Sequence, residues 1–246
     1  MLLGIISDIH ANELAFEACL AHCRSLGVER LVFAGDIVGY GADPEAVTAR
    51  VMGLADLGAI AIMGNHDQAI SAGAAGMNAI AAEAIAWTRP RLSPAAQRFL
   101  AGLPMQAVLG DVLFVHAEAS APTRWLYVTD AAAAMRSLIA VSQRITICGH
   151  VHVPQLYCMT ATAKVVAHAP VTGVPVTLAE QRQWLAVAGS TGQPRDGNPA
   201  AAFLTYDTAT RALTYRRAPY DHEAAADRVR AAGLPERLAT RLLMGA

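Results

Sequence analysis

The sequence has little charge of either sign and almost no lysine. Charged residues make up 16% of the 246 residues, the net charge is −1, and Lys164 is the single lysine, so arginine carries nearly all of the positive charge. Proteins that bind nucleic acid polymers usually present a basic patch or stripe, and no such electrostatic footprint is visible in this chain. We therefore expect no nucleic acid polymer as a partner.

Long apolar runs are also missing. No stretch of about 18 uninterrupted apolar residues occurs, as a membrane-spanning helix would need. The chain begins with the apolar run Leu2–Ile6 and shows no charged leader, apolar core and cleavage site of a signal peptide. We therefore expect no membrane partner and a cytoplasmic location.

Cysteine is scarce, and none of the four cysteines forms a C-x-x-C pair. Cys19, His22 and Cys23 would share one face of a helix and offer three metal ligands. A structural zinc site normally needs four ligands with a second pair nearby, so this pattern favours a buried helix face with small apolar thiols.

Five short polar segments stand at or just after the ends of apolar runs that are typical of β-strands. They gather four histidines, two aspartates and an asparagine of ligand type. Mixed imidazole and carboxylate ligands suit Mn, Fe, Zn, Co or Ni better than Mg or Ca. Two such cations about 3.5–4 Å apart can hold a bridging hydroxide and clamp a phosphoryl group. The pattern predicts two divalent transition metal ions as cofactors, held by Asp8-Ile9-His10, Gly35-Asp36, Gly64-Asn65-His66-Asp67, His116 and Gly149-His150-Val151-His152.

The first half of the chain alternates apolar runs with Ala-rich stretches, which is typical of β-α-β-α-β units. Such units form parallel strands with right-handed crossovers, and ligands bind beyond the carboxyl ends of the strands. The predicted strands are Leu2–Ile6, Arg30–Ala34 and Ala59–Met63, and the predicted helices run from Asn12 to about Leu26 and onward from about Pro44.

The later chain changes character. Residues 68–103 predict a helical insertion over the rim of the site, with two Ala-rich helices split by Arg89-Pro90 and Ser93-Pro94. Residues 221–231 and 235–244 predict a C-terminal helical pair, and we expect a single domain over 1–246. Between these segments lie mostly predicted strands: Val112–Val115, Arg144–Cys148, Gln155–Met159, Lys164–Ala167, Trp184–Ala188, Ala201–Tyr206 and Ala212–Arg216.

In their order, the five polar segments resemble the signature blocks of the calcineurin-like metallophosphoesterase superfamily: D-x-H, G-D, G-N-H-[DE], a lone His and G-H-x-H. The resemblance covers residues 2 to about 218. Segments 35–41 and 189–197 look like the small bacterial and archaeal, phosphodiesterase-like branch. The Ser/Thr protein phosphatases have an Asp-Arg pair where this chain has Gly39-Tyr40. The resemblance implies a four-layer αββα fold of the α/β class, in which a two-sheet β-sandwich is flanked by helices.

The resemblance also implies a role for each residue of the site. One metal ion would be held by Asp8, His10 and His152 and the other by Asn65, His116 and His150, with Asp36 bridging them. His66 would be the general acid that protonates the leaving oxygen while a metal-bridging hydroxide attacks phosphorus in line. The implied activity is metal-dependent hydrolysis of a small phosphorylated substrate, which is a phosphodiester, a phosphomonoester or a nucleotide. A non-catalytic metal-binding regulatory protein on the same fold and a protein phosphatase are the alternatives.

Two side chains beside the ligands have two interpretations each. Asn12 caps the first helix or contacts the metal ligands from behind. Asp67 orients His66 or caps the helix that follows it.

Other side chains bear on substrate binding. Arg195 lies in a Gly/Pro-rich loop, where it pairs with phosphate or carries a surface turn charge. Arg124 and Trp125 line the pocket, with Trp125 stacking a base, or Trp125 packs in the core and Arg124 is solvated. Glu118, two residues after His116, predicts a further carboxylate near the site.

Overall fold

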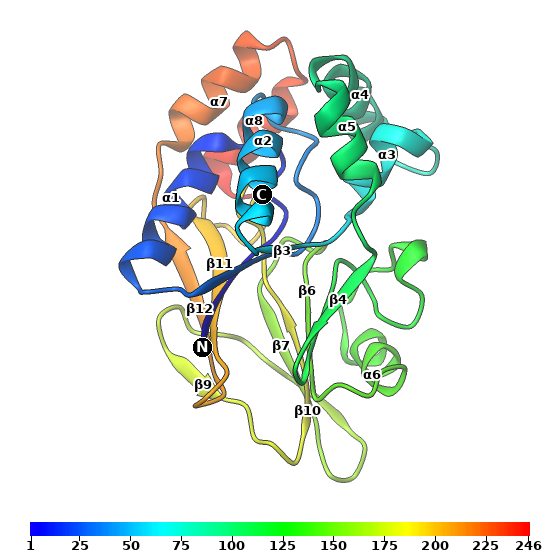
Figure 1. Ribbon diagram of the computed structural model, residues 1–246, viewed down its shortest axis with the longest axis vertical. Coiled ribbons are helices and arrows are strands. Elements are labelled where there is room, and N and C mark those ends of the chain that lie inside the picture. The colour runs from blue at the N-terminus through cyan, green and yellow to red at the C-terminus, as the bar shows by residue number, and fades with distance from the viewer.

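The computed structural model of the chain describes residues 1–246, with twelve strands in two six-stranded sheets and eight α-helices (Figure 1). From edge to edge, sheet A consists of β3 (Ile60–Ala61), β2 (Arg30–Phe33), β1 (Leu2–Ile6), β11 (Ala201–Asp207), β12 (Ala212–Ala218) and β9 (Pro175–Thr177). Sheet B consists of β4 (Gln106–Leu109), β5 (Val112–Val115), β6 (Ile145–Cys148), β10 (Gln183–Val187), β7 (Gln155–Met159) and β8 (Val165–His168). The helices are α1 (Glu13–Ser25), α2 (Pro44–Asp56), α3 (Asn65–Ala72), α4 (Ala79–Thr88), α5 (Pro94–Ala101), α6 (Ala131–Ile139), α7 (His222–Ala231) and α8 (Glu236–Met244).

Each sheet is mixed and contains one block of parallel strands. In sheet A, β1 pairs in parallel with β2 and β2 with β3, with Leu3 opposite Arg30 and Val32 opposite Ile60. In sheet B, β6 pairs in parallel with both β5 and β10. The carboxyl ends of the strands in each block therefore meet at one end of the sheet, as predicted for β1 to β3.

The strands are apolar on both faces because both faces are covered. Leu3 and Ile5 of β1 point into a core between the sheets, which Phe114 of β5 also enters, whereas Ile6 points outward into a core with the helices. Helix α1 packs on β11 and β12, and α6 packs on β7, β8 and β10. Covered strands of this kind read as continuous apolar runs rather than alternating patterns. The layers are helix, sheet, sheet and helix, which confirms the predicted fold class.

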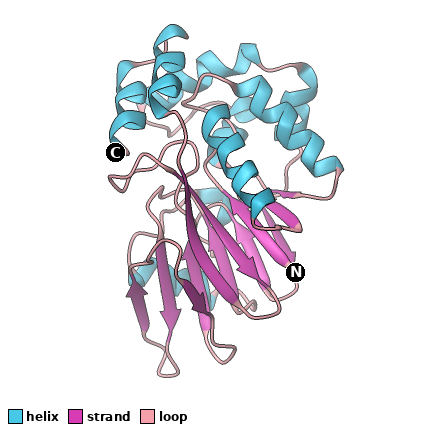
Figure 2. Cartoon of the chain, turned by 90° about the vertical axis from the view of Figure 1, so that its left-hand side faces the viewer, coloured by secondary structure: helices cyan, strands magenta, loops and turns pink.

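Most helices gather at the end of the sandwich where the parallel strands finish (Figure 2). The segment expected to be a helical insertion contains α4 and α5, joined by a 3₁₀ turn at Arg89–Arg91, and the end of α3. The C-terminal helices α7 and α8 pack against each other. Asn12 caps α1 by accepting a hydrogen bond from the backbone N–H of Ala15 at 3.2 Å. No helix is long and apolar enough to cross a membrane.

Three elements were not predicted from the sequence. Strands β4 and β9 are edge strands with half-exposed residues, so they lack a long apolar run. Ala131–Ile139, which the sequence left without an assignment, form α6 behind the N-cap Asp130. Alanine carries little periodic signal, and the high helix propensity of the Ala131–Ala134 run was the clue.

Candidate metal centre

The backbone at the strand ends has an unusual local conformation. Of the ten non-glycine residues with positive φ, eight lie at these ends or in the loops that face them. Left-handed conformations are costly for residues with a Cβ atom and persist only where the surroundings hold them, often at functional sites. The eight residues are Asp8, His10, Ala11, Asp36, Tyr40, Trp125, His150 and His152.

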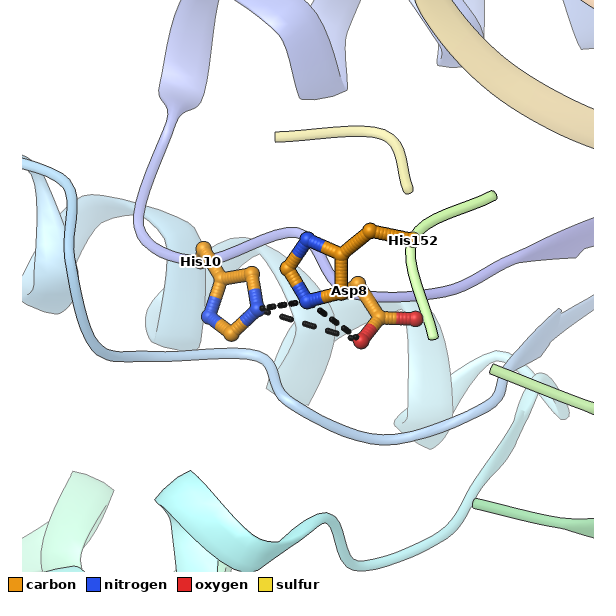
Figure 3. Close-up of side chains that lie close together, drawn as sticks. All are labelled: Asp8, His10 and His152. Carbon is orange, nitrogen blue, oxygen red and sulfur yellow. Dashed lines mark hydrogen bonds and ion pairs between the residues drawn. The ribbon is translucent and has the colours of Figure 1, made fainter. Parts of the chain in front are cut away.

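Asp8, His10 and His152 form one tight group (Figure 3). The Nε2 atoms of the two imidazoles are 3.1 Å apart, and the Nε2 of His152 lies 3.3 Å from Oδ1 of Asp8. Each Nδ1 lies beside a backbone carbonyl, that of Val38 at 3.1 Å for His10 and that of Gln193 at 2.7 Å for His152. A carbonyl only accepts, so Nδ1 of each ring carries a proton, and Nε2 is the atom that can present a lone pair to a metal ion.

Asp36, His116 and His150 form a second group. Oδ2 of Asp36 is 3.3 Å from Nε2 of His116 and 3.7 Å from Nε2 of His10, so this carboxylate lies between the two groups. Nδ1 of His116 donates to the carbonyl of Ala34 at 2.8 Å. Nε2 of His150 lies 2.9 Å from the carbonyl of Trp125, which leaves its Nδ1 for the centre.

This donor set fits divalent metal ions. Asn65 Oδ1 and His116 Nε2 are buried and have no hydrogen-bond partner in the protein. The Nε2 lone pairs of His10 and His152 point at each other beside the carboxylate of Asp8. These atoms would repel one another, and a cation bound between them would make the arrangement favourable. Orphaned buried acceptors are otherwise rare in folded proteins. The side chains predicted as metal ligands are thus brought together.

The ionisation of these groups follows from burial and mutual charge. Burial lowers the pKa of His150 to about 4 and holds the pKa of His10 well below its ordinary value. Burial acts to raise the pKa of Asp36, but His116 and His66 outweigh it and hold that pKa well below its usual range. Burial likewise opposes charge on His116, but Asp36 raises its pKa to about 10. Metal ligands must be deprotonated, so a metal ion would displace the proton on His116.

Glycines let the ligand loops approach each other closely. A Cβ at Gly64 would overlap the carboxylate and the backbone nitrogen of Asp36, and a Cβ at Gly149 would overlap Ser7 and Asp8. The glycines of the G-N-H-D and G-H-V-H segments are therefore needed for packing within the centre.

His66 lies at the edge of the centre and lines the adjoining cavity. Its ring is edge-on to His10 with centroids 4.9 Å apart, and its Nδ1 is buried without a hydrogen-bond partner. Burial lowers the pKa of His66 to about 4. An anionic substrate beside this imidazole would raise that pKa again, because negative charge favours the protonated form.

Asp67 and Asn12 hold loops in place. Asp67 Oδ1 accepts from the backbone N–H groups of Ile37 and Val38 at 2.9 and 3.2 Å, and Oδ2 accepts from that of Gly64 at 2.9 Å. Asp67 thus caps α3 and fixes the Asp36 loop, and it makes no hydrogen bond to His66. Besides its cap, Asn12 donates from Nδ2 to the carbonyl of Gly192 at 2.9 Å and so contacts segment 189–197.

A cavity of about 340 Å³ opens over the centre. We call its deep part, together with the ligands behind it, the floor, and its outer side chains the rim. The floor comprises Asp8, His10, Asp36, Asn65, His66, His116, His150 and His152, all but Asn65 of which are buried. The rim comprises Tyr40, Arg124, Trp125, Tyr127 and Arg195.

Arg195 and Arg124 differ although both line the cavity. Nη2 of Arg195 donates to Gln193 Oε1 at 2.8 Å, its guanidinium lies 5.7 Å above the ring of Tyr40, and its Nε is buried without a partner. The side chain of Arg124 is exposed and makes no hydrogen bond or ion pair within the protein. The guanidinium of Arg195 is therefore held in place beside the cavity, whereas Arg124 contributes only charge.

For Trp125 the structure supports the core-packing alternative, and for Glu118 the expectation of a carboxylate near the site is wrong. Trp125 donates from Nε1 to Gln68 Oε1 at 2.9 Å and packs edge-on against His116 and the core, so it is not a free stacking surface. Glu118 is wholly buried but does not line the cavity, and its Oε2 faces Arg136 of α6 at 3.9 Å.

Tyr127 was missed by sequence reasoning, although it occupies the rim. It stacks on His150, with ring centroids 4.0 Å apart, and is 54% exposed. No spacing or motif marks this tyrosine, because its place depends on the course of an irregular loop.

The cysteine and histidine trio of α1 is not a metal site. Cys19 and Cys23 are buried in the core between α1 and sheet A, and the His22 ring packs against Phe203 at 5.2 Å. None of the three belongs to a group that could hold a metal ion, so the buried-face interpretation is correct.

Comparison with known proteins places this geometry in context. The sequence matches the calcineurin-like phosphoesterase superfamily domain over residues 1–211. An uncharacterized protein of Methanocaldococcus jannaschii is 30% identical over 99% of this chain and 98% of its own length. The crystal structure of a metallophosphoesterase from Sphaerobacter thermophilus is 32% identical, covers 100% of both chains and superposes with a TM-score of 0.88. A hypothetical protein from Pyrococcus horikoshii, 19% identical with 100% and 98% coverage, has a TM-score of 0.81 and shares the fold.

Proposed function

Because the chain belongs to the calcineurin-like phosphoesterase superfamily, we propose that it is a metal-dependent hydrolase of small phosphate esters. Family membership confirms the resemblance noted in the sequence, and it implies phosphoester substrates and divalent metal ions. The use of two ions, the ligand roles and catalysis by His66 are parts of the proposal.

One observation carries the proposal. The paired Nε2 atoms of His10 and His152, the carboxylates of Asp8 and Asp36 and the unpartnered Asn65 Oδ1 and His116 Nε2 converge at or just behind the base of one cavity. In the proposal, one ion would be held by Asp8, His10 and His152. The other would be held by Asn65, His116 and His150, with Asp36 between the two sets. Divalent ions in such a set supply Lewis-acid polarisation of phosphate and activation of water.

The side chains of the cavity support the remaining tasks. His66 stands where it can give a proton to the leaving oxygen once phosphate has raised its pKa, and such general acid catalysis typically contributes 10²–10⁴-fold. Arg195 offers a guanidinium donor to a phosphate oxygen. A volume of about 340 Å³ suits a small molecule rather than a polymer or a folded phosphoprotein. A cytoplasmic location remains a prediction from the sequence.

The test begins with the purified protein, its bound metals and two assays. Bis-p-nitrophenyl phosphate and p-nitrophenyl phosphate are supplied with added Mn, before and after chelation. We expect hydrolysis of at least one ester, its loss on chelation with recovery on re-addition of metal, and its loss in Asp36→Asn. Leu57→Ser, at an 85% exposed position, is the control variant. Bound metal with no turnover of either ester would favour a non-catalytic metal-binding protein instead.

A further inference from the structure

The ring of Tyr127 has one covered face and one open face. The covered face stacks on the imidazole of His150, with planes only 15° apart. The residue is nevertheless 54% exposed and lines the cavity, so its exposed surface is the opposite face and the hydroxyl edge. A planar aromatic surface thus lies open to the cavity. The same ring stacks directly on His150, a predicted metal ligand.

The backbone beside Tyr127 is fixed before any substrate arrives. The carbonyl of Trp125 accepts from Nε2 of His150 at 2.9 Å, and the carbonyl of Leu126 accepts from the backbone N–H of Glu118 at 3.0 Å. The indole of Trp125 is tied to Gln68 of α3. Binding to a surface that is already ordered loses little conformational entropy.

Charge around this surface suits an anion attached to the planar group. Arg195 and Arg124 line the same cavity, and Asp36 of the floor is the single carboxylate among the lining residues. A phosphate over the floor and a flat ring on Tyr127 would therefore fit one molecule.

We propose that Tyr127 is the platform on which a planar ring of the substrate stacks, so that the preferred substrates are nucleotide-type phosphate esters. The proposal rests on the proposed function, since it assigns the group that the ester carries. A ring stacked on an aromatic side chain adds affinity for any base, because every base has a π-face.

The test uses two esters with the same leaving group. The p-nitrophenyl ester of thymidine 5′-phosphate carries a base, and methyl p-nitrophenyl phosphate does not, while the bond that breaks is the same in both. We expect Tyr127→Leu to lower the ratio of kcat/KM for the thymidine ester to that for the methyl ester about tenfold. Tyr127→Phe, which keeps the ring, should preserve the ratio.

Product binding supplies a readout that does not need turnover. Calorimetry compares adenosine 5′-phosphate with ribose 5-phosphate, and we expect the preference for the nucleotide to fall about tenfold in Tyr127→Leu. Equal losses on both esters would mean that Tyr127 only supports His150 and would overturn the proposal. If Tyr127→Phe also lost the preference for the thymidine ester, the hydroxyl rather than the ring would be responsible, which would contradict stacking. If the unaltered protein cleaves neither ester, the proposed function itself fails, which is a separate result.

Discussion

The floor and the rim of the cavity are built in different ways. Floor residues follow directly on parallel strands, they are nearly all buried, and each ligand histidine is oriented by a hydrogen bond to a backbone carbonyl. Rim residues come from irregular segments after β5 and β10 and from the loop after β2, and all of them except the buried Tyr40 are at least partly exposed. In the proposed function, the floor would therefore supply chemistry common to many phosphate esters, and the rim would select among them.

The largest expected difference between floor and rim concerns His66. In His66→Gln we expect kcat to fall about 10²–10⁴-fold on an alkyl phosphate ester, because the leaving alkoxide needs a proton. The loss on a p-nitrophenyl ester should be much smaller, since nitrophenolate leaves without one. Elemental analysis should find the metal content unchanged. Loss of metal together with activity would make His66 a ligand, in keeping with its place near His10 and Asp36.

A second floor variant tests packing rather than chemistry. Gly64→Ala places a methyl group against the Asp36 carboxylate, which cannot move freely because its Oδ1 accepts from the backbone N–H of His66 at 2.8 Å. We expect weaker metal binding and a kcat lower by about 100-fold, the scale of a 1 Å misplacement.

The control for this variant is another glycine. Gly53 lies within α2 and has open space where a Cβ would be. Gly53→Ala should leave activity intact and raise stability by about 0.5–1 kcal/mol through helix propensity. Equal behaviour of the two variants in metal titration and kinetics would contradict the tight fit inferred at Gly64.

The floor could be predicted from the sequence more fully than the rim, where Arg124, Trp125 and Arg195 were named but Tyr127 was not. Asp8, His10 and Asp36 follow strands whose apolar runs are legible, and parallel strands bring such ends together whatever the loops do. Trp125 and Tyr127 lie in a loop whose course depends on long-range hydrogen bonds, such as that between the Trp125 carbonyl and His150. Local sequence carries no record of these contacts, so it left both alternatives for Trp125 open and gave no sign of Tyr127.

Within the rim, the two arginines should differ. Arg195→Ala removes a donor that is held in place by Gln193 and should lower kcat/KM about 10–100-fold, the range of a charge-assisted hydrogen bond. Arg124→Ala removes an exposed side chain and should cost less than about threefold, an effect that added salt should reduce further. Steady-state kinetics at two ionic strengths would separate the variants. A larger loss in Arg124→Ala would reverse the assignment.

The smallest expected effect on substrate preference is that of changing Trp125. This variant distinguishes the position of the loop from the stacking surface of the neighbouring Tyr127. Trp125→Phe removes the hydrogen bond to Gln68 and some apolar packing, so we expect about 1 kcal/mol less stability and a Tm lower by about 2–4 °C. Because the indole is not the open surface, the preference for the thymidine ester over the methyl ester should stay within about twofold. Thermal unfolding and the two-ester ratio measure both effects on one sample. If Trp125→Phe lost the preference as fully as Tyr127→Leu, the position of the loop would govern substrate choice, because both variants would act through the same displaced backbone.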